Sequence, residues 1–153
     1  MTSPQPVPSA STAPPLPAHK LLSGQKAPVT GANSGIGRGV AIGLAQAGAD
    51  VMVNYVVGDD TAAAVVDEIR RSGAHGAAYK ADVSSEDEVA AMFRSMREQF
   101  GTIDILVANA GLQRDAPFQD MTLERWNKVR GVNLTGQFLC WREAVREFLH
   151  RGG

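Results

Sequence analysis

The sequence contains little cysteine and no excess of either charge. Cys140 is the only cysteine in 153 residues, which excludes a disulfide within the chain and a cysteine-based zinc cluster and agrees with a reducing compartment. The 15 Lys and Arg residues are balanced by 16 Asp and Glu residues, so no net charge draws the chain to nucleic acid or to an anionic membrane. No apolar run reaches membrane-spanning length. We therefore expect no nucleic-acid or membrane partner, and a small, nearly neutral ligand instead.

The first 20 residues lack the large apolar side chains that would offset the entropy of ordering them. Prolines there alternate with Ser, Thr and Ala, so residues 1–20 are predicted to be a disordered tail. The tail also lacks the apolar segment of a secretory signal and the arginines of a mitochondrial presequence, which favours the cytoplasm. Three histidines stand in tail, loop and terminus without metal-ligand spacing, so no metal site is predicted.

Short β-rich runs alternate with helical patterns along the rest of the chain. The predicted strands are residues 26–30, 50–57, 77–83 and 103–111. This alternation is typical of βαβ units, so the fold class is predicted to be α/β, a Rossmann-like doubly wound parallel sheet, truncated after about four strands and the fourth main helix. Pro28 in the first strand removes a ladder donor, and we expect it to leave a carbonyl unpaired.

The predicted helices have apolar residues at helical spacing. The first has a stripe of Ile36, Val40, Leu44 and Ala47; the second, capped by Asp60 or Thr61, has Ala64, Val65 and Ile69. The third has a possible capping box of Ser85 and Glu88 before Val89, Met92, Phe93 and Met96, and Gly101 beyond its last turn. The last starts near Thr122, with anchors at Trp126, Val129, Leu134, Phe138, Trp141, Val145 and Phe148.

A glycine-rich turn, TGANSGIG at residues 30–37, joins the first predicted strand to the first predicted helix. Such a turn places several backbone N–H groups and the positive end of the helix dipole at one point, which is suited to bind phosphate. Gly31 allows the tight turn, Gly35 leaves room for a pyrophosphate, and Gly37 lets the helix lie near the sheet. A flexible linker would contain the same letters, but the strand before and the helix after favour nucleotide binding.

The expected phosphate donors are the N–H groups at the start of this helix, those of Ser34, Gly35, Ile36 and Gly37. The spacing G-x-x-x-G-x-G differs from the common dinucleotide fingerprint G-x-G-x-x-G. A P-loop is excluded because no G-K-S/T follows the turn.

Four motifs in this order resemble those of the short-chain dehydrogenase/reductase family: TGANSGIG at 30–37, ADV at 81–83, NAG at 109–111 and VNLTG at 132–136. The resemblance covers residues 21–153, which it identifies as the N-terminal, cofactor-binding part of such a domain. Within the family, LLSGQK and FLCWREAVREFL look most similar to bacterial glucose 1-dehydrogenases. The resemblance implies NAD or NADP as cofactor, a sugar or alcohol substrate, and a homo-oligomer.

The resemblance also assigns roles to single residues. Asp82 would accept a hydrogen bond from the adenine amino group, with the backbone of Val83 beside it. A turn of small residues would lie beside the adenosine ribose; its members are Asn109, Ala110 and Gly111. Asn133 would be the catalytic asparagine that bends its helix and holds a water in the proton relay. The alternatives are a capping or surface aspartate for Asp82, a structural turn without a binding role for residues 109–111, and an ordinary polar helix residue for Asn133.

The end of the second predicted strand is where the nicotinamide cofactor would be selected. An acid there favours the free ribose hydroxyls and an arginine favours a 2′-phosphate. This corner reads Asn54, Tyr55, Val56, with Tyr55 as the expected cofactor contact, and it contains neither charge. The choice between NAD and NADP stays open at this point.

The family's catalytic tyrosine and lysine are missing from the sequence. The family spacing Tyr-x-x-x-Lys is not met, because Asp59 follows Tyr55 and Val83 follows Tyr79 at that distance. We therefore expect the chain alone to be inactive and to be the N-terminal part of an NAD(P)-dependent oxidoreductase. The alternative is a non-catalytic dinucleotide-binding or dimerising module.

Overall fold

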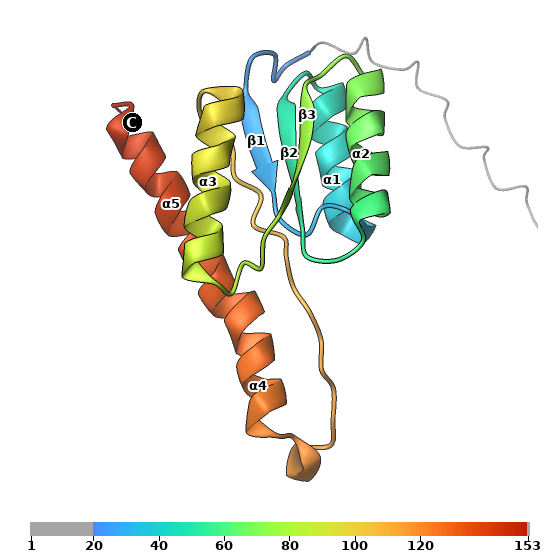
Figure 1. Ribbon diagram of the computed structural model, residues 1–153, viewed down its shortest axis with the longest axis vertical. Coiled ribbons are helices and arrows are strands. Elements are labelled where there is room, and N and C mark those ends of the chain that lie inside the picture. The colour runs from blue at the N-terminus through green and yellow to red at the C-terminus, as the bar shows by residue number, and fades with distance from the viewer. Residues whose placement is uncertain (1–19, 153) are drawn as a thin grey trace, which may run out of the picture.

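The structure is a computed structural model that describes residues 20–152. The predicted disordered tail lies outside the described residues, except for Lys20. Three parallel strands form the sheet, in the order β1-β2-β3, and helices cover both of its faces (Figure 1). The strands are β1 (Lys26–Val29), β2 (Asp50–Tyr55) and β3 (Gly76–Lys80). The helices are α1 (Gly35–Gln46), α2 (Asp59–Arg71), α3 (Glu86–Phe100), η1 (Phe118–Asp120), α4 (Leu123–Arg130), η2 (Gly131–Gly136) and α5 (Gln137–His150).

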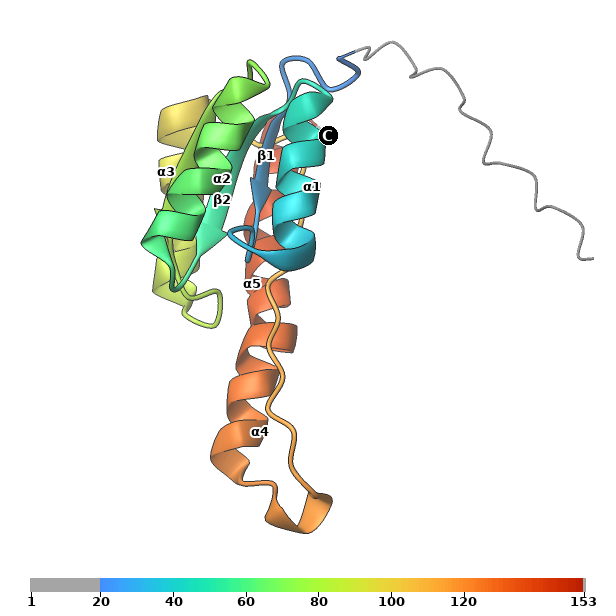
Figure 2. The ribbon, with the colours of Figure 1, turned by 90° about the vertical axis from the view of Figure 1, so that its right-hand side faces the viewer.

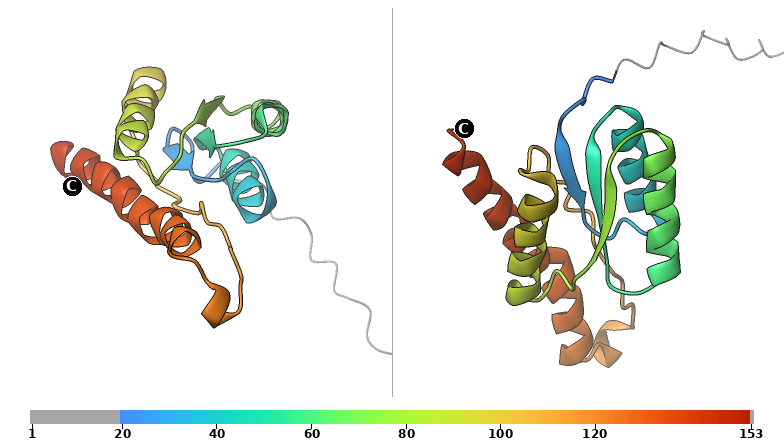
Figure 3. Two further views of the ribbon diagram at one scale, coloured as in Figure 1. Left: turned by 60° about the horizontal axis from the view of Figure 1, so that its bottom comes forward. Right: turned by 45° about the horizontal axis from the view of Figure 1, so that its top comes forward.

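Two hydrophobic cores lie on opposite faces of the sheet. Successive side chains of a strand point to opposite faces, and in β2 the fully buried Val51 and Val53 pack with α1 and α2, whereas Met52 packs with α3 and α5. The views in Figure 3 show these two pairs of helices on either side of the strands. The predicted α/β doubly wound parallel sheet is confirmed.

The predicted fourth strand, residues 103–111, is wrong as a regular strand. The segment runs beside β1, on the side away from β2, but forms only an isolated parallel bridge between Val29 and Val107. The Val107 carbonyl accepts from the N–H of Thr30 at 2.9 Å. The position beside β1 agrees with a strand that would continue the sheet; the regular pairing is absent.

Pro28 interrupts the hydrogen-bond ladder between β1 and this segment. The N–H of Val107 donates to the Pro28 carbonyl at 3.0 Å, and the N–H of Ile105 donates to the Lys26 carbonyl at 3.1 Å. A regular parallel ladder would have one more hydrogen bond between these two, donated by the N–H of residue 28 to the Ile105 carbonyl. Proline has no N–H, so this bond is missing. Within residues 20–152 no other donor reaches that carbonyl. The expected unpaired carbonyl is thus found at Ile105.

The apolar stripe predicted for α1 is partly wrong. The buried residues of α1 are the small ones, Gly37, Ala41 and Ala45, while Ile36 is 80% exposed. Small residues let α1 lie close to the sheet just after the glycine turn, so the larger side chains are left at the edges of its contact face. Hydrophobic periodicity alone favours large residues and therefore misplaced the buried face.

The residues that cap the N-termini of α2 and α3 mark where these helices begin. The predicted cap of α2 is wrong: the N-cap is Gly58, with φ 85°, and the helix begins at Asp59. In α3 the N-cap is Ser85, whose Oγ accepts from the N–H of Glu88 at 3.4 Å, as predicted. The second half of the predicted capping box is absent, because the Glu88 carboxylate accepts from the N–H of Asp82 at 2.8 Å instead.

The last predicted helix is one continuous rod with a π-helical segment, η2, between α4 and α5. Thr122 caps it, and its lower part with η1 projects beyond the sheet (Figure 2). The buried residues are Val132, Gly136, Leu139, Cys140 and Ala144. Of the predicted apolar anchors, Phe148 packs against the core from the margin. Five others are exposed in this chain: Trp126, Leu134, Phe138, Trp141 and Val145.

None of the helices formed by residues 20–152 has the length and apolar character needed to cross a membrane.

Candidate functional site

A cavity of about 670 Å³ lies where the strands end and their connecting loops begin. Its walls come from the glycine turn after β1, the loop after β2, the loop after β3, the segment after Val107 and the face of α4 and η2. Ligands of open α/β sheets bind at this carboxyl edge. The lining residues are Gly31, Asn33, Ser34, Ile36, Gly37, Asn54, Tyr55, Val56, Val57, Asp82, Val83, Asn109, Ala110, Gly111, Leu112, Arg114, Lys128 and Val132.

The structure brings almost all of the predicted site residues to this one cavity. The exceptions are Gly35 and Asn133, which do not line it. Sequence reasoning did not select Asn33, Val57, Leu112, Arg114, Lys128 or Val132. Asn33 and Val132 stand at variable or apolar positions inside the motifs TGANSGIG and VNLTG. The others stand in the loops after β2 and after Gly111 or on α4, where no local pattern distinguishes them from other loop and helix residues.

Gly37 is the glycine at which the turn and the helix meet most closely. A Cβ built on Gly37 would lie 2.3 Å from the Gly31 carbonyl oxygen and 2.5 Å from Nδ2 of Asn109. Both distances are far inside van der Waals contact, so only glycine fits. This agrees with the predicted need for close approach of helix and sheet.

The first turn of α1 faces the cavity with free backbone donors. A helix leaves its first N–H groups without intrahelical acceptors, and among the described residues no acceptor pairs with the N–H groups of Gly35, Ile36 or Gly37. The exposed Ser34 is the N-cap and its side chain makes no capping hydrogen bond. These donors, with the positive end of the helix dipole, fit a phosphate group.

Buried polar side chains hold the glycine turn in place. Asn54 is 1% exposed; its Oδ1 accepts from the N–H of Gly31 at 3.2 Å and its Nδ2 donates to the Ala81 carbonyl at 2.9 Å. The hydroxyl of Thr30 accepts from the N–H groups of Asn109 and Ala110, both at 2.9 Å. The glycine turn is therefore tied to the loops after β3 and after Val107.

Asn109 acts on the turn rather than on the open cavity. Its Nδ2 donates to the carbonyls of Thr30 at 2.9 Å and Gly31 at 3.2 Å, which uses both hydrogens of the amide. The sequence prediction gave it a place beside the ribose; the structure adds that its side chain fixes the shape of the turn.

Asp82 is held in one orientation at the cavity wall. Its Oδ1 accepts from the N–H and the hydroxyl of Ser84 at 2.9 and 2.6 Å, and its Oδ2 accepts from Nζ of Lys128 at 3.1 Å. Burial raises the pKa of Asp82, but the hydrogen bonds from Ser84 and the charge of Lys128 outweigh this, so the pKa lies below its usual value. The carboxylate is thus charged at neutral pH and can accept a further hydrogen bond.

Asn133 lies in the π-helical segment η2 and fastens the loop that follows Gly111. Its Oδ1 accepts from the N–H of Leu112 at 2.9 Å and its Nδ2 donates to the Leu112 carbonyl at 3.0 Å. A widened π turn at this residue fits the expected bend of the helix. One hydrogen of the Asn133 amide has no acceptor among these bonds, and its part in a proton relay stays a prediction.

The described residues contain no group of three or more His, Cys, Asp or Glu side chains that could hold a metal ion.

A parallel sheet with helices on both faces, a glycine turn that leads into a helix and a cavity at the strand ends define a dinucleotide-binding protein of the Rossmann type. The model of the short chain dehydrogenase family matches residues 25–153. The chain belongs to this family, as its motifs predicted.

Relatives among curated and solved proteins agree with this membership. The chain is 42% identical over 123 residues to a 3-oxoacyl-acyl-carrier-protein reductase of Staphylococcus aureus, covering 80% of this chain and 50% of that protein. It is 41% identical over 134 residues to a hydroxynaphthalene reductase-like protein of Metarhizium acridum, covering 88% and 50%. Thus the chain spans about half the length of the curated relatives it matches. The names of these two relatives are those of reductases, so they do not show the finer resemblance to glucose 1-dehydrogenases.

Solved structures give the same fold. A short-chain dehydrogenase/reductase from Mycobacterium marinum superposes with a TM-score of 0.83 at 37% identity, covering 88% of this chain and 54% of that one. A short chain dehydrogenase from Burkholderia cenocepacia, solved in complex with NADP, gives a TM-score of 0.81 at 35% identity, covering 83% and 52%. Family membership and this relative support NAD or NADP as the cofactor.

Proposed function

We propose that the chain binds a nicotinamide dinucleotide at the cavity and forms the cofactor-binding part of an oxidoreductase. The observation that carries this proposal is the set of free N–H groups in the first turn of α1, beside a turn whose residues 31, 35 and 37 are glycines without side chains. The pyrophosphate would lie there, and Asp82 would accept a hydrogen bond from the adenine amino group. Ala110, Gly111 and the backbone of Val83 would line the space for the adenosine.

The reaction class proposed is hydride transfer between the nicotinamide and a carbonyl or alcohol. When bound, the cofactor supplies or accepts the hydride; the residues of this chain bind and orient it. The reductase names of two relatives favour reduction of a carbonyl over oxidation of glucose. The cytoplasmic location and the homo-oligomer expected from the sequence stay predictions.

Proton transfer would need residues that these 153 do not contain. General acid–base assistance contributes about 10²–10⁴ in rate, and neither Tyr55 nor Tyr79 has a lysine four residues later. We expect the chain alone to bind the dinucleotide without turning over a carbonyl substrate.

The test is a titration of the 153-residue chain with NAD and with NADP by calorimetry, followed by an absorbance assay with NADH or NADPH and a 3-oxoacyl thioester. Binding without turnover is the expected result. Absence of heat with both nucleotides would refute the binding proposal, and clear turnover would refute the prediction of inactivity.

A further inference from the structure

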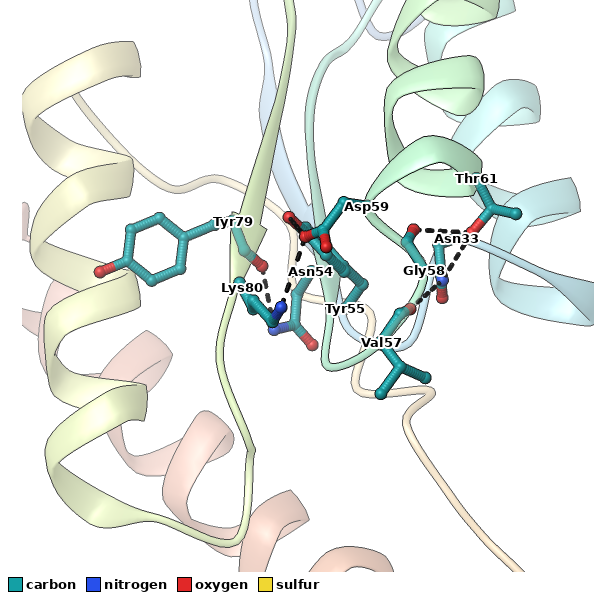
Figure 4. Close-up of polar contacts among 9 residues, drawn as sticks. All are labelled: Asn33, Asn54, Tyr55, Val57, Gly58, Asp59, Thr61, Tyr79 and Lys80. Atoms are coloured by element: carbon teal, nitrogen blue, oxygen red, sulfur yellow. Dashed lines mark hydrogen bonds and ion pairs between the residues drawn. The ribbon is translucent and has the colours of Figure 1, made fainter.

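We propose that the cavity selects NAD over NADP, because the corner after β2 offers no cation to a 2′-phosphate. This inference rests on the proposed function, since it concerns which dinucleotide the cavity holds. The selecting residue of such folds stands about 20 residues after the glycine turn, which is the end of β2. We call Asn33, Tyr55, Val56, Val57 and Gly58 the ribose corner, and Figure 4 labels all of these except Val56.

The basic side chains near the ribose corner are paired elsewhere. On α1, Arg38 donates to the Glu68 carboxylate of α2 at 2.5 Å. At the end of β3, Nζ of Lys80 lies 3.5 Å from Oδ1 of Asp59. The two basic residues that line the cavity come from other segments than the corner. Arg114 stands three residues after Gly111, and Lys128 on α4 is paired with Asp82.

The two residues that directly follow the ribose corner in the sequence are acidic. Asp59 and Asp60 form the first turn of α2, directly after Gly58. The hydroxyl of Tyr55 donates to Oδ1 of Asp59 at 2.7 Å, and this bond together with the charge of Lys80 lowers the pKa of Asp59. An ionised carboxylate therefore stands behind the tyrosine that faces the cavity, and it repels a phosphate.

The neutral side-chain donors of the ribose corner are already used. Nδ2 of Asn33 donates to the Val57 carbonyl at 2.7 Å and to Oγ1 of Thr61 at 3.0 Å, which uses both hydrogens of the amide. The hydroxyl of Thr61 in turn donates to the Gly58 carbonyl at 2.8 Å. A Cβ on Gly58 would lie 2.6 Å from Oγ1 of Thr61, so these bonds also fix the loop tightly.

A 2′-hydroxyl and a 2′-phosphate make different demands on this corner. The hydroxyl can both donate and accept, so carbonyls and water satisfy it, whereas the phosphate needs donors and positive charge. We expect NAD to bind about 10- to 100-fold more tightly than NADP, since this is the factor that one charge-assisted hydrogen bond provides.

The experiment measures the dissociation constants of NAD and NADP for the 153-residue chain and for two variants at one position. Val57 is 75% exposed, and in Figure 4 its side chain points away from the hydrogen bonds of the corner. Val57→Arg adds a guanidinium, and Val57→Gln is a neutral control of related shape. Circular dichroism checks that both variants keep the wild-type fold.

The expected result is tighter binding of NAD to the wild type, and a change of about tenfold or more toward NADP in Val57→Arg but not in Val57→Gln. If the wild type binds NADP as tightly as NAD, or more tightly, the inference is overturned while the proposed function stands. If neither nucleotide binds, the proposed function fails, and the inference with it. An equal change in both variants would overturn the explanation by charge.

Discussion

Replacement of Gly37 by alanine tests the geometry on which the site depends. The added methyl group would lie 2.3 Å from the Gly31 carbonyl oxygen and 2.5 Å from Nδ2 of Asn109. Neither atom can move freely: Asn109 donates to the carbonyls of Thr30 and Gly31, and the Gly31 N–H donates to Asn54. The helix or the turn must therefore shift, and the Asn109 hydrogen bonds must lengthen or break.

The magnitude follows from these contacts. Overpacking costs about 1–3 kcal/mol, and each of the two hydrogen bonds of Asn109 contributes about 0.5–1.5 kcal/mol. Together these give a loss of about 2–6 kcal/mol, a large fraction of the 5–15 kcal/mol by which typical domains are stable. Because the shift occurs at the phosphate donors, dinucleotide binding should be lost as well.

Gly43 offers a matched control in the same helix. A Cβ there has no neighbouring atom within 4 Å, so Gly43→Ala should gain up to about 1 kcal/mol from helix propensity. Urea denaturation followed by circular dichroism measures both variants, with nucleotide binding as the second readout. Equal stability of Gly37→Ala and wild type, or equal destabilisation by the two substitutions, would refute this reasoning.

Three further outcomes follow from the structure. Burial raises the pKa of the Cys140 thiol to about 12, so this cysteine should resist alkylation at pH 8 in the folded chain and react once urea unfolds it; rapid labelling without urea would contradict this. Although burial opposes it, hydrogen bonding from Ser84 lowers the pKa of Asp82 in the folded chain. The Asp82 carboxylate therefore contributes its full stabilisation above the unfolded pKa of about 3.9, and this stabilisation is lost as the pH falls through the lowered folded value. Asp82→Asn should make the denaturation midpoint depend less on pH in this acidic range, and an unchanged dependence would count against the prediction. Pro28→Val supplies an N–H facing the Ile105 carbonyl, so the new amide should be protected in hydrogen exchange, and a freely exchanging amide would show that the pairing is not limited by proline.

The sequence predicted the elements whose local pattern and packing agree. In β2 a nearly continuous apolar run matches a strand buried on both faces. In α3 the cap at Ser85, the glycine at 101 and the stripe through Phe93 all indicate the same helix. The predictions failed where packing overrides periodicity. Ile36 stands at the cavity instead of in the core, and the burial of α1 is provided by glycine and alanine, which hydropathy weighs lightly.

The rod of α4, η2 and α5 shows a second limit of the pattern. The apolar side chains of Leu134, Phe138, Trp141 and Val145 recur at helical spacing, yet they are exposed in this chain. Periodicity indicates that a face is apolar and cannot say what covers it. The prediction of a homo-oligomer assigns that face to another copy of the chain, and molecular mass in solution would test it.

The candidate site was found through its glycines, but its shape is set by other residues. Thr30 and Asn54 are buried polar side chains, and with Asn109 they join the glycine turn to segments 23 to 80 residues away in sequence. A buried polar group is costly unless it is hydrogen-bonded. Here the hydrogen bonds that satisfy these three side chains also hold the backbone of the glycine turn in place. No window of local sequence reveals such pairs, because the partners come together only when the sheet forms. The glycine motif therefore marks the proposed dinucleotide site, whereas the buried amides of Asn54 and Asn109 and the hydroxyl of Thr30 hold the turn in its observed conformation.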